Sequence, residues 1–226
     1  SMDSEDFVEL TENKYNRLLT VIFLFLLAIV VPERYHLAKL AGFSFFLISM
    51  LSIVRQIKPV RWIKRFYTLL IICSLLLLPG WFFQWLTIDA LNYGQLLLKL
   101  VLLIVIGLPV FLIQKEIFLT EKVTADTIKG GIAIYLLLGL AWATFYDALY
   151  GVTSSAFSGI SPSQYQADFL HFSFVTLTTV GYGEILPVTT LARVSADLEA
   201  IAGVMYPAIL IARLVSLYKS NSQEPG

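Results

Sequence analysis

The chain has 226 residues, of which 58% are hydrophobic and only 14% are charged. A soluble domain usually has about 45–50% apolar and about 25% charged residues, so this composition excludes an ordinary soluble domain. Sixteen basic residues balance sixteen acidic ones, and zero net charge argues against nucleic-acid binding, which needs a basic face. With one cysteine, Cys73, the chain cannot form a disulfide framework, a thiolate metal cage or a paired-cysteine redox centre.

Six apolar stretches approach the length of about 20 residues that a helix needs to cross the roughly 30 Å hydrocarbon core of a membrane. They cover residues 18–31, 37–54, 66–86, 93–113, 130–150 and 191–218. The first stretch is short for a crossing, and its alternative is an interfacial or tilted placement. We expect an all-α membrane protein with six transmembrane helices per chain.

Six crossings assign each connecting segment to one side of the membrane, and the basic residues are distributed unevenly between the two sides. If the N-terminus is inside, twelve Lys and Arg residues lie on the inner side and three on the outer side. Because basic segments stay in the cytoplasm, this predicts an integral protein, of the plasma or inner membrane, with both termini cytoplasmic.

One cluster of basic residues on the inner side has two interpretations. It contributes to the charge asymmetry that sets the topology, and it is also suited to binding anionic lipid headgroups. It consists of Arg55, Lys58, Arg61, Lys64 and Arg65.

Residues 151–188, between the fifth and sixth crossings, are too polar at their start and too short in their apolar part to span the membrane. This stretch must therefore enter the membrane and return. Ser163 followed by Gln166 is a capping-box signature, which predicts a helix over residues 164–178 that runs inward from the outer face. Two alternating glycines, Gly181 and Gly183, follow at once, and a helix cannot continue through them.

The segment after this re-entrant helix is suited to binding a bare monovalent cation. Gly181 and Gly183 can adopt positive φ, which lets consecutive carbonyls face the same side. Non-helical backbone inside a membrane is tolerated only where protein buries it or where it lines an aqueous path. The carbonyl oxygens of Thr179, Val180, Gly181 and Tyr182, with the Thr179 hydroxyl, are candidates to replace the ion's water shell. Neutral dipoles hold such an ion weakly enough to release it, as conduction requires.

The sequence Thr179-Val180-Gly181-Tyr182-Gly183 is identical to the selectivity filter of potassium channels. With a helix on each side of this loop, the chain resembles a six-helix member of the tetrameric cation-channel superfamily. The resemblance implies a homotetramer, because one chain supplies one of the four filter segments that surround an axis. It also implies passive, potassium-selective conduction with K⁺ as the permeant ion, no cofactor and no catalytic residue.

The resemblance divides the chain into five parts. They are an N-terminal cytoplasmic tail (1–17), a four-helix domain like a voltage sensor (18–113), an interfacial linker (114–129), a pore domain (130–218) and a C-terminal tail (219–226). The fourth crossing lacks the ladder of Arg or Lys that drives voltage gating in relatives, and its one basic residue is Lys99. Since Lys99 can extend to the nearby outer surface, we expect weak or absent voltage gating.

Three positions near the filter depart from the family pattern. Glu184 follows the filter where potassium channels usually carry Asp, and His171-Phe172 stands where many carry paired Trp. His171 could donate a hydrogen bond to Glu184 and so form a filter brace that titrates near neutral pH, or it could simply pack within the pore helix. Val175 occupies the position where some bacterial channels have a buried carboxylate, so no buried acid is expected behind the filter.

The resemblance also assigns residues of the last helix. Gly203 falls at the family's hinge position, and Pro207 removes a backbone donor four residues later. Val204, Pro207, Ile211 and Val215 would line the inner pore, with an apolar constriction near Ile211 and Val215. The alternative is that these side chains pack against the fifth helix.

Other function classes fit the sequence less well. A membrane hydrolase that pairs His171 with a serine has neither a glycine-flanked serine nor a buried acid to orient the base. The candidate serines are Ser154, Ser155, Ser158 and Ser173. A cation transporter often retains fewer filter glycines and several pore loops. The main alternative is a non-selective monovalent cation channel, and Tyr182 is the residue that argues against it.

Overall fold

The computed structural model describes residues 4–31, 35–57, 59–83, 88–119, 124–161 and 164–221. Its helices are α1 (Ser4–Val30), α2 (His36–Gln56), α3 (Arg61–Phe83), α4 (Ile88–Leu119), α5 (Ala125–Val152), α6 (Tyr165–Leu177) and α7 (Thr190–Asn221). A 3-10 turn, η1 (Ser154–Ala156), precedes β1 (Phe157–Ser158), which pairs antiparallel with β2 (Leu186–Pro187). The all-α class expected from the sequence is confirmed.

Each predicted crossing falls on one of these helices. Among the described residues, α2, α3, α4, α5 and α7 contain apolar windows long enough to cross a membrane. The first predicted crossing lies on α1, which is not among these five, so the sixth crossing stays a prediction. The five spans establish an integral membrane protein.

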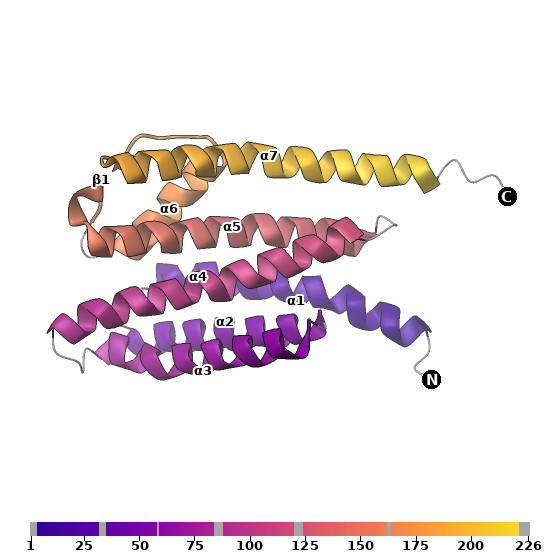
Figure 1. Cartoon of the computed structure of the whole chain (residues 1–226), viewed down its shortest axis with the longest axis horizontal. Coiled ribbons are helices and arrows are strands. Elements are labelled where there is room, and N and C mark those ends of the chain that lie inside the picture. Colours follow the sequence, from indigo (N-terminus) through magenta and orange to yellow (C-terminus); the bar gives the residue numbers. More distant parts are fainter. Residues whose placement is uncertain are drawn as a thin grey trace.

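The helices form two groups that α4 connects (Figure 1). Helices α5, α6 and α7 lie together on one side, and α1, α2 and α3 lie on the other. Helix α4 crosses obliquely between them and packs along α5. The start of α1 and the end of α7 lie at one end of the molecule, whereas α6 and β1 lie at the opposite end.

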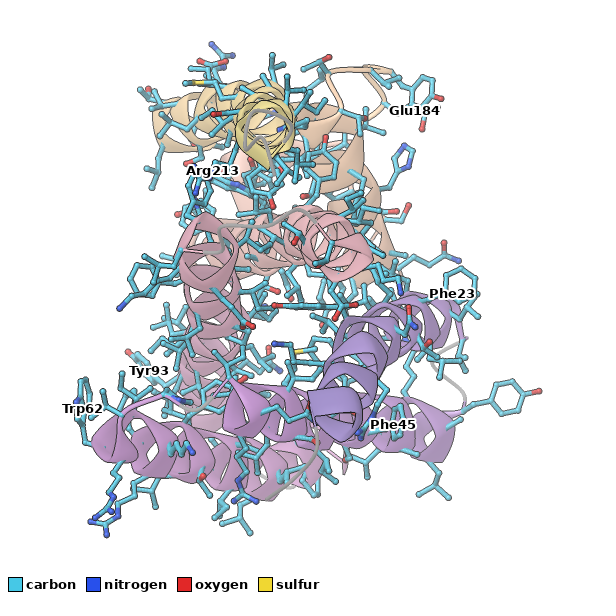
Figure 2. The ribbon with its side chains drawn as sticks, turned by 90° about the vertical axis from the view of Figure 1, so that its right-hand side faces the viewer. Phe23, Phe45, Trp62, Tyr93, Glu184 and Arg213 are labelled. Carbon is cyan, nitrogen blue, oxygen red and sulfur yellow. The ribbon has the colours of Figure 1, made fainter. Side chains whose placement is uncertain are left out.

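Aromatic residues mark both the interior and the perimeter of the α1–α4 group. Inside, Phe25 of α1 stacks on Phe46 of α2 with ring centroids 4.1 Å apart. On the perimeter, Trp62 near the start of α3 and Tyr93 near the start of α4 point away from the ribbon, as Figure 2 shows. They are 66% and 78% exposed. Since aromatic side chains favour the interface between membrane and water, exposed rings are expected at such positions.

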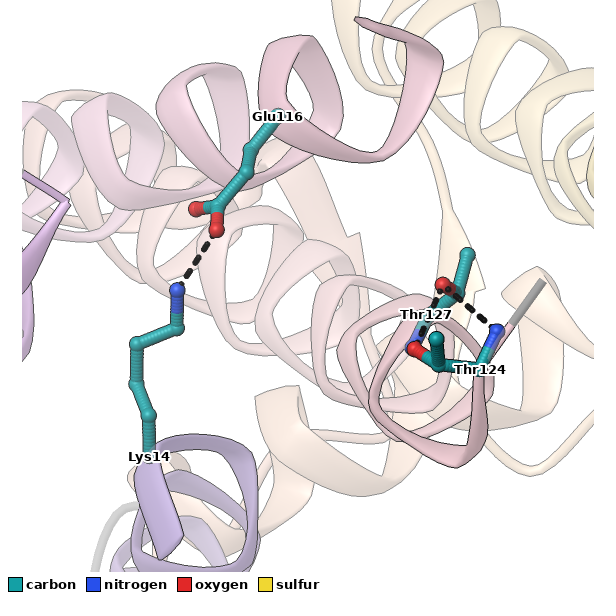
Figure 3. Close-up of polar contacts among 4 residues, drawn as sticks. All are labelled: Lys14, Glu116, Thr124 and Thr127. Carbon is teal, nitrogen blue, oxygen red and sulfur yellow. Dashed lines mark hydrogen bonds and ion pairs between the residues drawn. The ribbon is translucent and has the colours of Figure 1, made fainter. Parts of the chain in front are cut away.

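The stretch 114–129, expected as an interfacial linker, is divided between two long helices. Its first part continues α4 to Leu119, its last part begins α5 at Ala125, and residues 120–123 lie outside the described residues. Helix α5 starts with a capping box in which the Thr124 hydroxyl accepts from the Thr127 amide and the Thr127 hydroxyl accepts from the Thr124 amide (Figure 3). The cap favours a new helix at this point, because it satisfies two amides that the first helical turn leaves unpaired.

The end of the molecule that carries the start of α1 is held by polar contacts between distant segments. Lys14 of α1 forms an ion pair with Glu116 near the end of α4, with 2.7 Å between Nζ and Oε1 (Figure 3). Burial and the Glu116 carboxylate raise the pKa of the neighbouring Tyr15 hydroxyl. Arg213 of α7 donates to the Phe118 carbonyl at 3.1 Å, so α1, α4 and α7 are tied together here.

Lys99 does not extend to the outer surface, and that expectation was wrong. Its side chain is buried, and Nζ lies 2.7 Å from Asp147 Oδ1 and 3.1 Å from the Asp147 carbonyl oxygen on α5. The physical reason is the register of α4 on α5, which places a carboxylate beside the lysine. A paired charge needs no route to water.

Candidate functional site

The helix that the sequence predicts to re-enter the membrane corresponds to α6, which begins one residue later than expected. Gln164 stands at its N-cap without a side-chain hydrogen bond. Ser163, the predicted cap, lies outside the described residues. The described contact at this end is a hydrogen bond from the Ser161 amide to Asp168 Oδ2, at 2.6 Å.

An aromatic cluster positions α6 against α5 and the outer loop. Phe172 packs edge-on to Tyr146 of α5 with ring centroids 5.0 Å apart, and Phe169 packs on Phe157 of β1 at 5.2 Å. Tyr146 and Phe157 also meet, at 5.4 Å. All four residues are buried, so Phe172 has a packing role at the position where many relatives carry Trp.

The carboxyl end of α6 is fixed by two neighbouring helices. The Leu177 carbonyl accepts a hydrogen bond from Tyr135 of α5 at 3.2 Å. Gly203 of α7 lies directly against the same carbonyl, and a Cβ added there would collide with the Leu177 oxygen. Gly203 is therefore a close-contact glycine in this structure. A hinge at this position remains a prediction.

In the turn after α6, every second residue has a positive φ. Thr179, Gly181 and Gly183 have φ of +59°, +60° and +81°. The positive φ predicted for the two glycines is confirmed, whereas the one at Thr179 was not foreseen. The amides of Val180 and Gly181 both turn back to the Val175 carbonyl, at 2.9 and 3.4 Å.

The carbonyl oxygens of this turn are available to a ligand. Among the described residues, no hydrogen bond is accepted by the carbonyls of Thr179, Val180, Gly181 or Tyr182. These residues are exposed in the single subunit, and the Tyr182 side chain is 67% exposed. Four successive main-chain oxygens thus lack a partner among the described residues, and their exposure in the single subunit leaves them open to a ligand or to another copy of the chain.

His171 and Glu184 lie close together beside the filter sequence. His171 Nε2 is 3.8 Å from Glu184 Oε2, which is too long for a hydrogen bond but within reach of an ion pair if the imidazole is protonated. The His171 ring also lies parallel to the Tyr182 ring, with centroids 5.9 Å apart. Figure 2 shows Glu184 on the outside of the molecule.

The two faces of α7 differ in packing. Tyr206 donates to the Gly131 carbonyl of α5 at 3.0 Å, and Leu210 contacts the same glycine. Of the residues assigned to the inner pore, Val204, Ile211 and Val215 are 59%, 59% and 50% exposed, and Pro207 is half-buried. The exposure of Val204, Ile211 and Val215 in the single subunit favours the pore-lining assignment over packing against the fifth helix, and that assignment stays a prediction.

A buried acid lies behind α6, contrary to expectation. Glu199 of α7 is fully buried, with Oε1 2.5 Å from the Ser173 hydroxyl of α6 and Oε2 2.6 Å from the Tyr146 hydroxyl of α5. The expectation considered position 175 of the pore helix, but this acid comes from the neighbouring helix. A charged residue within the apolar stretch 191–218 was the signal that could have indicated it.

Known proteins match part of this chain. A family described as "Ion channel" matches residues 123–220. "Two pore potassium channel c" of Oryza sativa subsp. japonica is 41% identical over 91 residues, which cover 40% of this chain and 18% of that protein. "Two-pore potassium channel 4" of Arabidopsis thaliana is 32% identical over 98 residues, which cover 43% of this chain and 34% of that protein. No solved structure matches.

Proposed function

We propose that this chain is a channel and not an enzyme, and that it conducts K⁺ passively through a pore built from four copies. The match of residues 123–220 to the family described as "Ion channel" and the similarity to two plant two-pore potassium channels support this proposal. The observation that carries this proposal is the row of unpartnered carbonyls at Thr179, Val180, Gly181 and Tyr182. Four such rows around an axis would coordinate a dehydrated K⁺ without any fully charged ligand.

The end of α6 supports a cation at the same axis. The carboxyl end of a helix carries a partial negative charge, and α6 ends at Leu177, two residues before the first filter carbonyl. The turn over residues 179–183 contains neither Asp nor Glu, so a cation there would meet main-chain carbonyls and not carboxylates. The proposed site therefore binds through dipoles, which allow release as well as entry.

Weak voltage dependence is part of this proposal. Each charge that crosses the whole field contributes roughly 2.3 kcal/mol per 100 mV, so steep gating needs several mobile charges. Lys99 is the basic residue of the fourth crossing, and its pairing with Asp147 holds it against α5. We expect the open probability to change little with voltage in current recordings. A steep voltage dependence would contradict this part of the proposal.

The helix packing supports six crossings, which would place both termini on the same side of the membrane. We propose that this side is the cytoplasm, from the distribution of basic residues. The Tyr15 ring lies beside Gly130 near the start of α5, and Ile29 lines a small cavity together with Asp147 near the other end. Gly130 and Asp147 are about 25 Å apart along α5 by helix rise, most of the hydrocarbon thickness. Helix α1 would then cross like the other five. Cysteines introduced at Asn16 and Asn221, which lie outside the predicted crossings, should then be labelled from one and the same side only.

Anionic lipid is the proposed partner of the inner basic cluster. Arg55, Lys64 and Arg65 line one groove with Thr68 and Leu69, which would place a headgroup phosphate among three cations and its chains along the apolar surface. Arg61 is exposed nearby, and Lys58 lies outside the described residues. Native mass spectrometry should detect fewer bound anionic lipids after the paired change Arg55→Gln and Arg65→Gln. Unchanged lipid binding would exclude this site.

Ion flux into liposomes tests the proposed function. The purified protein should pass K⁺ and Rb⁺ far better than Na⁺, and external Ba²⁺ should block the flux. Replacing Tyr182 with Asp should weaken selectivity while the tetramer remains folded. Equal K⁺ and Na⁺ flux in the natural protein would instead favour a non-selective cation channel.

The variant Gly181→Ala tests the carbonyl geometry itself. A Cβ at Gly181 meets no atom within 4 Å, so its effect comes from the backbone conformation alone. Alanine disfavours positive φ by about 1 kcal/mol or more, and four copies incur that cost together. We expect loss of K⁺ flux. The control Gly107→Ala, on α4 and also without a contact within 4 Å, should leave flux intact.

A further inference from the structure

Glu199 joins three helices behind the filter. The carboxyl group belongs to α7 and is fully buried. One oxygen faces the Tyr146 hydroxyl of α5 and the other faces the Ser173 hydroxyl of α6. The Ser173 hydroxyl also lies 2.8 Å from the Gly139 carbonyl oxygen of α5.

Positive charge does not balance this carboxyl within the described part of the chain. None of the ion pairs formed there involves Glu199. The groups that interact with it or with its partner Tyr146 are the phenol of Tyr135 on α5 and the carboxyl of Asp197 on α7 itself. Helix α6 contributes the neutral Ser173 hydroxyl. An ionised carboxylate at such a site would be buried without a counter-ion, which is strongly unfavourable.

The count of protons at Ser173 points the same way. A serine hydroxyl has one proton, yet Ser173 lies between the Gly139 carbonyl and the Glu199 carboxyl. A carbonyl can only accept. Both short contacts are therefore hydrogen bonds only if Ser173 donates to Gly139 and the carboxyl donates to Ser173.

We propose that Glu199 keeps its proton and acts as a positioning residue that clamps the inner helix to the pore helix. Glu199 Oε1 then donates to Ser173, Ser173 donates to the Gly139 carbonyl, and Tyr146 donates to Glu199 Oε2. Every polar hydrogen in this chain of contacts has an acceptor, and no charge is buried. The role in conduction rests on the proposed channel function, whereas the protonation of Glu199 does not.

The clamp fixes the filter through a second contact one helical turn away. Glu199 and Gly203 are four residues apart on α7, and they meet Ser173 and Leu177, which are four residues apart on α6. Two contacts at matching spacing fix how α6 lies along α7. Thr179 follows Leu177 by two residues, so the clamp sets the position at which the unpartnered carbonyls begin.

An infrared difference spectrum tests the proton directly. We compare the full-length protein with Glu199→Gln at neutral pH, with Asp197→Asn as the matched control on the same helix. The spectrum should show loss of one protonated-carboxyl carbonyl band in Glu199→Gln, which remains in Asp197→Asn. Loss of a carboxylate band in its place would overturn the proposal.

Flux measurements in liposomes test the positioning role. The glutamine amide can donate to Ser173 and accept from Tyr146, so Glu199→Gln should keep K⁺ flux and selectivity within about twofold. Glu199→Ala leaves two hydroxyls unpartnered and should reduce K⁺ flux or selectivity by about tenfold or more, as expected for a buried hydrogen bond that is left unmade. Loss in both variants, or normal behaviour in Glu199→Ala, would overturn the positioning role. If the natural protein carries no flux, the channel function fails, and the infrared result still decides the protonation.

Discussion

Gly203 shows how one missing side chain brings two helices together. The absence of a Cβ lets α7 rest against the Leu177 carbonyl at the end of α6, where Tyr135 also donates a hydrogen bond. A backbone carbonyl cannot rotate out of the way as a flexible side chain can. Helix α7 is therefore held directly against the carboxyl end of α6.

Replacing Gly203 with Ala should destabilise the protein by about 1–3 kcal/mol, the usual cost of forcing an extra group into a packed site. Denaturant unfolding in detergent would measure this change. The helical glycine Gly107 has open space around it, so Gly107→Ala should be neutral or slightly stabilising. Equal stability of the two variants would show that the contact at Gly203 is absent.

The contact between His171 and Glu184 should make only a small contribution to the proposed filter. The two side chains lie 3.8 Å apart and are 47% and 74% exposed, so removing the contact should change K⁺ flux by no more than a few-fold. Liposome flux of His171→Phe, compared with the natural protein, would measure this change. Identical flux in the two proteins would exclude the brace.

At the scale of single residues, the sequence predicted features that depend on the local backbone conformation. It did not predict contacts that depend on how one helix is aligned along another. Positive φ at Gly181 and Gly183 follows from the residue type. The partners of Glu199 and Lys99 come from helices far away in the chain, and single-sequence periodicity does not set the register between helices. Both acquired buried polar partners that the sequence left undetermined.

The element that connects the two helix groups is α4, and its attachment to α5 includes a buried ion pair. Lys99 and Asp147 side chains are 11% and 14% exposed, so each depends on the other for its counter-charge. Both side chains line a small cavity, which they share with apolar residues such as Phe25 and Leu140 and with the polar Gln166. It therefore fixes α4 to α5 at one particular register.

Breaking this pair from one side should be costly. Asp147→Asn leaves the Lys99 charge buried and should lower the free energy of unfolding by about 3–5 kcal/mol. The joint replacement Lys99→Met and Asp147→Leu should recover much of that loss, since it removes both charges. Unfolding in detergent would measure both effects.

The pair of Lys129 and Asp126 provides the control. Its atoms are 4.0 Å apart and Lys129 is 29% exposed, so Lys129→Met should cost less than about 1 kcal/mol. If Asp147→Asn is as mild as this control, α4 is not anchored at Lys99.

The helices themselves were predictable because their apolar stretches are long and bounded by charge, Pro or Gly. The expected linker at 114–129 was a different case. Its mixture of apolar and charged residues fits an interfacial helix, but the same mixture also fits the polar ends of two long helices. Thr124 and Thr127 supply the cap that starts α5, and a Thr in place of Glu or Gln made this signal weaker.

At the scale of the whole molecule, a single subunit leaves its proposed functional surface uncovered. The filter residues are exposed, and α7 has the lowest buried share of the five candidate spans, at 11%. Its exposed face includes Val204, Ile211 and Val215. Neighbouring copies would cover α7 and bring the filter turns together, which agrees with a closed ring of identical subunits.

The most direct test is a density map of the purified protein in lipid nanodiscs with K⁺ present. We predict four subunits around one axis, with ion density on that axis level with the carbonyls of Thr179, Val180, Gly181 and Tyr182. A lone subunit, or an assembly whose Gly181-Tyr182-Gly183 turns lie away from the shared axis, would contradict the account.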